Sequence, residues 1–129
     1  MNPTAKWLLF WGAIAAGSGV ALGAFGAHGL RGTVSADMLG IYETGVRYQM
    51  YHAFGLIAAG FACAMASDQA LNRFKLVGFL FGIGVLLFSG SLYALVLTNA
   101  TWLGAITPLG GLSFIAGWAV FASTCWGTK

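Results

Sequence analysis

Long apolar stretches separated by short polar segments dominate this chain. A helix that crosses a membrane needs about 20 mostly apolar residues, at about 1.5 Å each, to cover about 30 Å of hydrocarbon. Four stretches meet this requirement, at residues 7–27, 50–66, 74–97 and 106–126. The pattern therefore predicts an all-α membrane protein with four transmembrane helices in a compact bundle, formed as a single domain over residues 1–129.

The longest segment between apolar stretches has a helical pattern of its own. Ser35 is suited to cap a helix and Asp37 to its first turn, and the apolar positions of MLGIYETGVRYQ recur at helical intervals. One helix from residue 36 to 66 would be about 46 Å long, more than the bilayer core requires. We therefore expect a short outer-surface helix between spans 1 and 2, bent or broken near Gly40 or Gly45.

Composition supports a membrane protein and limits its partners. Of the 129 residues, 59% are hydrophobic and 7% are charged, whereas a soluble domain carries about 25% charge. The six basic residues are scattered, so the net charge of +3 does not indicate nucleic-acid binding. Cys63 and Cys125 both lie in apolar stretches and are interpreted as packing residues rather than a disulfide. The expected surrounding is the lipid bilayer.

The basic residues also orient the predicted helices. An even number of spans places both termini on one side, together with the connector at residues 67–74. That side is the more basic one, since it carries Lys6, Arg73, Lys75 and Lys129 against Arg31 and Arg47 on the other. The positive-inside rule therefore predicts that both termini are cytoplasmic.

Small residues recur every fourth position in two of the stretches. Span 1 has Ala15, Gly19, Gly23 and Ala27, and span 3 has Gly78 and Gly82. Such faces let helix backbones approach closely, which matters in lipid because apolar side chains gain nothing by leaving apolar tails. Two interpretations stay open: packing within one bundle, and a homo-oligomer that uses one of these faces.

Polar side chains gather at one depth when the four spans are placed antiparallel. Span 1 ends at His28, span 2 begins at residues 48–52, and span 3 carries polar residues in its outer third. Helical spacing puts Glu43, Arg47 and Tyr51 on one stripe. The cluster expected near the outer surface consists of His28, Glu43, Arg47, Tyr48, Gln49, Tyr51, His52, Ser89, Ser91, Tyr93 and Thr107. It forms either a ligand-binding site or a polar lid that caps the helices.

No ionisable side chain is expected near mid-membrane in any span. Ion-coupled pumps place such groups there despite a cost of several kcal/mol, so a proton- or sodium-driven transporter is disfavoured. A passive pore for a small neutral solute needs no such charge. The sequence is therefore compatible with a passive pore, which we would expect to form between subunits.

The candidate metal ligands fall on opposite sides of the membrane. His28 and His52 are expected outside and Cys63 and Cys125 toward the inside, out of reach of one zinc ion with bonds of about 2.0 to 2.3 Å. Two outer histidines leave a haem iron or a copper ion as an alternative. No Ser-His-acid set, phosphate loop or carboxylate pair indicates catalysis. We therefore predict no enzyme, no metal site and no cofactor, with haem or quinone as the exception to test.

Four stretches of the chain carry a family resemblance. They are LGAFGAHGL (22–30), YQMYHA (48–53), LFSGSLYAL (87–95) and ITPLGGLSFIAGW (106–118). Together they resemble the small four-span membrane family known as domain of unknown function four-two-three, whose animal relatives are called transmembrane protein two-five-six. The resemblance covers nearly the whole chain. It implies four membrane helices in a bacterial inner membrane and brings no established activity.

The resemblance also marks individual positions of this sequence. The marked residues are Gly23, Gly26, His28, Tyr48, Gln49, His52, Ser89, Gly90, Ser91, Tyr93, Pro108, Gly110 and Gly111. The chain departs from the family pattern at Phe54 and Gly55, where leucine and alanine are common. The small-residue stripes and the family resemblance together indicate which glycines pack helices. These are Gly19, Gly23, Gly26, Gly78, Gly82, Gly90, Gly110 and Gly111.

Three hypotheses for function follow. The leading one is a non-enzymatic, multi-pass inner-membrane protein, a homo-oligomer whose outer polar cluster binds or passively conducts a small neutral or lipid-like molecule. The second is a structural or assembly protein with no ligand, in which the cluster only caps and orients helices. The third is a redox subunit that binds haem or quinone, which requires His28 and His52 to approach one another.

Overall fold

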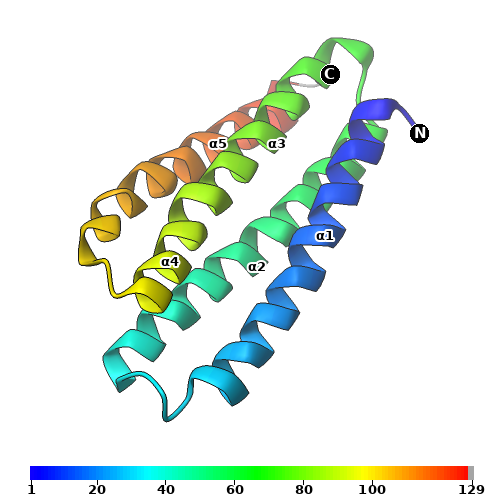
Figure 1. Ribbon diagram of the computed structural model, residues 1–129. Helices are drawn as coiled ribbons and strands as arrows, with labels where there is room; N and C mark the ends of the chain where they lie inside the picture. Colours follow the sequence, from blue (N-terminus) through cyan, green and yellow to red (C-terminus); the bar gives the residue numbers. More distant parts are fainter. Residues whose placement is uncertain (128–129) are drawn as a thin grey trace.

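The computed structural model describes residues 1–127, and these are almost entirely helical. In chain order the elements are α1 (Pro3–Phe25), the π-helical turn η1 (Gly26–Leu30), α2 (Ala36–Ala64), the 3-10 turn η2 (Asp68–Ala70), α3 (Leu71–Gly84), the π-helical turn η3 (Val85–Ser89), α4 (Gly90–Thr98), the 3-10 turn η4 (Thr101–Ala105) and α5 (Thr107–Gly127). Because α3, η3 and α4 follow one another without a gap, the fold consists of four antiparallel rods (Figure 1).

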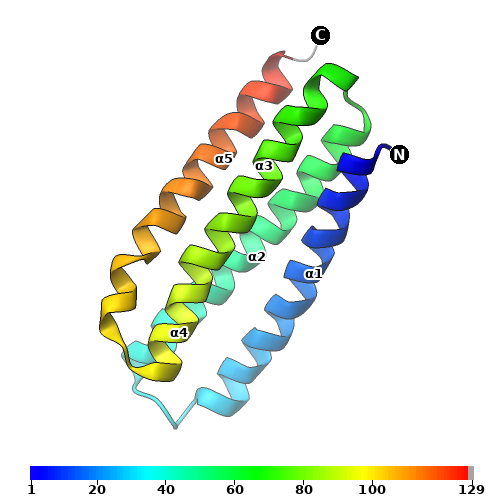
Figure 2. The same ribbon diagram turned by 45° about the horizontal axis from the view of Figure 1, so that its top comes forward.

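The start of α1 and the end of α5 lie at the same end of the molecule (Figures 1 and 2), which we call the N/C end. The opposite end, which carries the turns between α1 and α2 and between α4 and α5, is the far end. Lys129, which contributes to the predicted charge balance, lies outside the described residues.

Capping side chains determine where two of the helices begin. Asn2 Oδ1 accepts a hydrogen bond from the Ala5 amide at 2.8 Å and caps α1. Ser35 Oγ accepts from the Met38 amide at 3.2 Å and caps α2. The cap predicted at Ser35 is therefore confirmed.

The predicted outer-surface helix does not exist as a separate element. α2 runs without interruption through 29 residues, and both Gly40 and Gly45 lie inside it. A Cβ built on Gly45 would lie 2.8 Å from Cε1 of Tyr93, so Gly45 lets α2 approach α4 closely. The prediction of a separate helix is therefore wrong: this glycine serves packing, and the contact stabilises a helix that would otherwise be weak there.

α2 is the central rod of the bundle. α1 packs along α2, α5 packs along α3, and α2 also contacts α3, η3 and α4. Figures 1 and 2 both show α1 and α5 as the two outermost rods. One buried apolar cluster, which includes Leu8, Phe74 and Phe81, fills the N/C half, and a second, which includes Tyr42 and Leu95, fills the far end.

The glycines expected to pack helices have different surroundings. A Cβ would meet another side chain or backbone within 3.0 Å at Gly19, Gly26, Gly78 and Gly110, and Val46 at 3.4 Å from Gly23. At Gly90 and Gly111 the nearest atom would be 3.9 Å away. At Gly82 no atom lies within 4 Å. Gly82 therefore faces an open space.

Three helical segments are long and apolar enough to cross a membrane: Pro3–Leu30, Asp68–Thr98 and Thr101–Gly127. α2 is long enough too, but Asp37, Glu43 and Arg47 lower the hydropathy of its first half. Three of the four expected spans thus correspond to apolar helices in the described part of the chain.

Candidate functional site

Gln49 and His52 lie near the middle of α2 rather than at its outer end. His52 is sixteen residues after Ala36 and twelve before Ala64, so it lies about 24 Å along the helix. The expectation that His52 lies near the outer end of its helix is therefore wrong. The error has a physical source, since hydropathy places the start of span 2 at residue 50 whereas the helix begins fourteen residues earlier.

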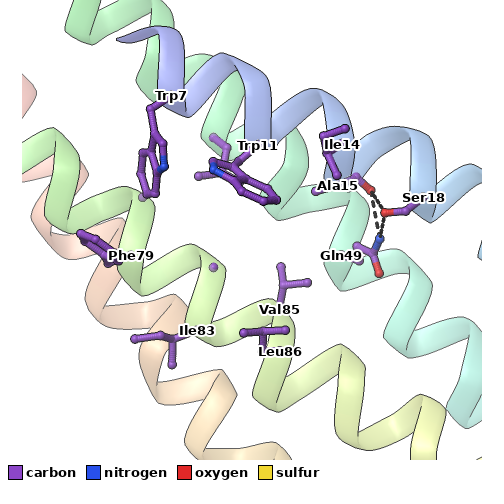
Figure 3. A pocket seen from close by; sticks show the side chains of 13 residues that line it. Trp7, Trp11, Ile14, Ala15, Ser18, Gln49, Phe79, Ile83, Val85 and Leu86 are labelled. Atoms are coloured by element: carbon purple, nitrogen blue, oxygen red, sulfur yellow. Dashed lines mark hydrogen bonds between the residues drawn. The ribbon is translucent and has the colours of Figure 1, made fainter. Parts of the chain in front are cut away.

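Gln49 joins three helices through its side-chain amide. Its Oε1 accepts a hydrogen bond from the Tyr93 hydroxyl at 2.8 Å. Its Nε2 donates to the Ala15 carbonyl and to Ser18 Oγ, both at 2.9 Å (Figure 3). One buried side chain thus connects α2 with α1 and α4, and three of its four hydrogen-bonding positions are used.

His52 uses both of its ring nitrogens. The indole N–H of Trp118 in α5 donates to His52 Nε2 at 3.0 Å. Because an indole N–H can only donate, Nε2 must accept, and the ring proton lies on Nδ1, which donates to the Tyr48 carbonyl at 2.7 Å. The ring also stacks on Phe114, with centroids 3.4 Å apart and planes at 8°. His52 is therefore a neutral side chain that holds α2 against α5.

The serine and threonine members of the cluster join helices near the far end. Ser89 Oγ donates to the Gly45 carbonyl at 2.6 Å, between η3 and α2. Ser91 Oγ and Thr107 Oγ1 lie 2.6 Å apart, between α4 and the start of α5. Within residues 1–127, no buried side-chain nitrogen or oxygen lacks a hydrogen-bond partner. These polar groups satisfy one another and leave no unpaired group for a ligand.

The remaining members of the expected cluster are exposed. His28, in η1, is exposed, as are Glu43 and Arg47, and no ion pair joins these two side chains in the described structure. Tyr48 and Tyr51 are 38% and 53% exposed, with ring centroids 5.6 Å apart. The expected cluster therefore divides into a paired interior set and an exposed set.

The structure does not bring the two histidines together. His28 lies at the far end, whereas His52 lies at mid-height, and a metal at His52 would have to displace Trp118 or the Tyr48 carbonyl. No group of three or more His, Cys, Asp or Glu side chains in residues 1–127 is arranged to hold a metal ion. The bis-histidine geometry that the redox hypothesis requires is not formed.

A groove opens between α1 and the rod of α3 and η3. Its volume of about 420 Å³ falls within the range of about 300 to 1,000 Å³ that is typical of ligand pockets. Figure 3 shows Trp7 and Trp11 of α1 on one wall and Phe79 and Leu86 on the other. Gln49 and Ser18 close the end farther from Trp7, and their polar atoms are already paired. The groove therefore presents an almost wholly apolar surface.

Sequence reasoning missed several residues of this region. Ser18, the partner of Gln49, is a lone polar side chain inside an apolar span, and Trp118 lies in the middle of α5 rather than at an interface. Both positions were visible signals of a buried polar contact. Trp7 and Trp11 line the groove, although neither was among the expected site residues.

Comparison with known proteins identifies relatives along most of the chain. The family model described as protein of unknown function (DUF423) matches residues 22–111. A UPF0382 membrane protein of Staphylococcus haemolyticus is 47% identical over 88% of this chain and 89% of its own length. UPF0382 membrane protein YwdK of Bacillus subtilis is also 47% identical, over 88% of this chain and 90% of its own.

A more distant relative has a more specific name. UPF0382 inner membrane protein YgdD of Escherichia coli (strain K12) is 41% identical over 91% of this chain and 87% of its own length. No solved structure matches the chain. The matches confirm the resemblance drawn from the four sequence motifs.

Proposed function

The chain belongs to the DUF423 family of membrane proteins, and on that premise we propose that it is a non-enzymatic, multi-pass protein of the bacterial inner membrane that binds a lipid-like molecule. The binding site is the groove between α1 and α3. The polar cluster holds the helices in the arrangement that keeps the groove open. This proposal moves the ligand from the polar cluster, where the sequence predicts it, to the adjacent apolar surface.

α2 is the fourth span in this proposal. It is 29 residues long, which at about 1.5 Å per residue is more than enough to cross about 30 Å of hydrocarbon. Its two polar side chains at mid-height, Gln49 and His52, are buried and paired, so they are not presented to lipid. Glu43 and Arg47 lie toward the far end, where the helix leaves the membrane.

The orientation follows from the charges at the two ends. Lys6, Arg73 and Lys75 lie at the N/C end, against Arg31 and Arg47 toward the far end. The positive-inside rule then favours a cytoplasmic N/C end. The E. coli relative is named as an inner membrane protein, which supports the same membrane for this chain.

The groove is the observation that carries the proposal. It has the volume of a ligand pocket, it is apolar, and Gly82 in its wall has no atom within 4 Å of a built Cβ. A soluble apolar ligand would have to compete with lipid for such a site, whereas a lipid-like molecule already surrounds it. A lipid-like occupant is therefore the one that the surroundings favour.

The other form of the leading hypothesis, passive conduction, requires several copies of the chain. Leu8, Phe74 and Phe81 are buried together in the N/C half of the bundle, so a path would have to run between subunits. A homo-oligomer could also fill the groove with a helix of a second copy. The structural hypothesis is supported by a different observation, the fully paired network around Gln49 and His52.

The test is native mass spectrometry of protein extracted gently from its own membranes, with lipid identification on the same sample. We expect one bound lipid on the unaltered protein. Gly82→Leu should lose at least ten-fold of this occupancy, because the new side chain fills the groove without a clash. Gly17→Leu is the matched control, since Gly17 also has no atom within 4 Å but does not line the groove.

Two results would overturn the proposal. If the unaltered protein carries no lipid, the groove is not a lipid-binding site. If Gly82→Leu changes the oligomeric state and leaves the lipid occupancy intact, the groove is an interface between copies. A discrete oligomer that loses its lipid with Gly82→Leu keeps the proposal and adds the homo-oligomer to it.

A further inference from the structure

We propose that the occupant of the groove is an anionic phospholipid of the leaflet at the N/C end, with one acyl chain in the groove and its phosphate beside Lys75. This inference rests on the proposed function and gives its ligand a chemical class, a direction and a headgroup contact.

A second hollow adjoins the groove at the N/C end. It has a volume of about 300 Å³ and is lined by Pro3, Thr4, Trp7, Lys75 and Phe79. Trp7 and Phe79 line the groove as well, and their ring centroids lie 5.3 Å apart. An apolar groove and a hollow that carries a cation thus share the same two rings, which is the arrangement that a molecule with an apolar tail and an anionic head requires.

The length of the groove fits one leaflet. From Trp7 to Ser18, α1 advances eleven residues, or about 16 Å. Half of a hydrocarbon core of about 30 Å is about 15 Å. An acyl chain that enters beside Trp7 would therefore end near Ser18 and Gln49, whose polar atoms are paired and present no unsatisfied group to its methyl end.

The charges at the two ends of the molecule indicate which end of the groove the lipid headgroup occupies. Basic side chains exceed acidic ones at the N/C end, where Lys6, Arg73 and Lys75 stand against Asp68, whereas Arg31 and Arg47 are balanced by Asp37 and Glu43 in the far-end half. Lys75 is exposed, and within residues 1–127 no hydrogen bond or ion pair occupies its ammonium group. Its charge is therefore available to a phosphate.

Arg73 is another cation at the N/C end, and its position differs from that of Lys75. Its Nε donates to Thr124 Oγ1 at 3.1 Å and one terminal nitrogen donates to Ser123 Oγ at 2.7 Å, which fixes α3 against α5. It does not line the groove or the hollow beside it. Among the basic side chains of residues 1–127, Lys75 is the one that lines the hollow next to the apolar groove.

The experiment is a competition between two phospholipids. Protein purified in a neutral detergent and stripped of lipid is mixed with equal amounts of phosphatidylglycerol and phosphatidylcholine that differ slightly in acyl mass. Native mass spectrometry then gives the occupancy of each. We expect phosphatidylglycerol to be preferred about five-fold, because the attraction between one lysine and an anionic headgroup favours binding by about that factor.

Two variants test whether Lys75 is responsible for the preference for phosphatidylglycerol. Lys75→Gln should bring the ratio close to one while phosphatidylcholine binding stays unchanged, because the groove itself is intact. Lys6→Gln is the matched control: it removes the same charge at the same end from a side chain that does not line the hollow. The ratio for Lys6→Gln should remain near that of the unaltered protein.

The outcomes separate this inference from the proposal on which it rests. Binding of both lipids with no preference, or a preference that survives Lys75→Gln, would overturn the headgroup contact and leave the groove as a lipid site. An equal loss in Lys6→Gln would show a diffuse surface charge and overturn it too. Failure of the unaltered protein to bind either lipid would contradict the proposal that the groove is a lipid site.

Discussion

Two sides of α2 show how differently the same kinds of residue can be used. Toward α4 and α5, its glycines meet aromatic rings: a Cβ on Gly45 would lie 2.8 Å from Tyr93 of α4, and one on Gly55 would lie 3.2 Å from Trp118 of α5. Across the other side, where α1 faces α3, Gly82 meets no atom within 4 Å and a groove remains. A glycine permits close approach of two helices, but the space is filled only where a large side chain of the neighbouring helix packs against it.

Hydrogen bonds follow the same division. Ser89 and His52 donate and accept across the closed side, between α2 and its neighbours η3 and α5. The groove ends at Gln49, whose amide is directed to α1 and to Tyr93 rather than into the opening. Because helices in lipid gain little from apolar contact alone, close packing and hydrogen bonds together decide which side closes. The closed side should therefore tolerate change far less than the open one.

Gly110→Leu should have the largest effect on the closed side. A Cβ at Gly110 would lie 2.8 Å from the Cα of Phe88, and backbone cannot move aside as a side chain can. We expect a loss of about 3 kcal/mol in the free energy of unfolding, measured by detergent-induced unfolding with tryptophan fluorescence. Gly111→Leu is the control, because its nearest contact is 3.9 Å away. Equal losses for both variants would contradict the tight contact.

Gln49→Leu should have the next largest effect. The change removes three hydrogen bonds between α2, α1 and α4, and at about 0.6 kcal/mol for each such bond in a membrane bundle the loss is about 2 kcal/mol. The same unfolding measurement applies, and Gln69→Leu is the control, since Gln69 is exposed. A variant as stable as the unaltered protein would mean that the network adds nothing to stability.

Trp118→Phe should have a smaller effect, of about 0.6 kcal/mol, because it removes one hydrogen bond and keeps an aromatic ring beside Phe81. Nitrogen NMR of labelled histidine gives a second readout. In the unaltered protein His52 should carry its proton on Nδ1, and the variant should lose the shift of a hydrogen-bonded Nε2. Trp126→Phe, at a position 93% exposed, should leave both unchanged. The same histidine spectrum in both variants would argue against the assigned tautomer.

Gly82→Leu should have the smallest effect on stability, less than about 0.5 kcal/mol, because the new side chain enters open space. Gly78→Leu, one turn earlier on the same face, should be clearly destabilising, since a Cβ there would press on the rings and methyl groups of Trp7 and Leu8. Unfolding of the two variants side by side measures the difference. If Gly82→Leu is as harmful as Gly78→Leu, Gly82 does not face open space as described.

Much of the architecture could be predicted from local features of the sequence. The apolar stretches gave three of the four rods, and the Ser35 cap marked where α2 begins. The position of Gln49 and His52 near the middle of α2 could not be predicted in the same way. Hydropathy averages over all faces of a helix, so the polar side chains that α2 directs inward, Gln49 and His52, counted as if they faced lipid.

The expected site was correct in composition and wrong in arrangement. Tyr93, Ser89 and Gln49 do come together, whereas Glu43 and Arg47 remain exposed on the same helix. Tyr42, which was not among the expected site residues, is buried and donates to the Leu22 carbonyl at 2.7 Å. Helical spacing tells which residues share a stripe, but it does not tell which stripe the neighbouring helices cover.

The sequence by itself determined that this is a helical membrane protein, where most helices begin, and which family it belongs to, because hydropathy, caps and motifs are properties of short stretches of chain. The tertiary structure alone decided that His52 pairs with Trp118, that α2 is one unbroken helix, and that a groove remains at Gly82. Each of these depends on the rotation and height of one helix against another, which are set by contacts between residues far apart in the chain.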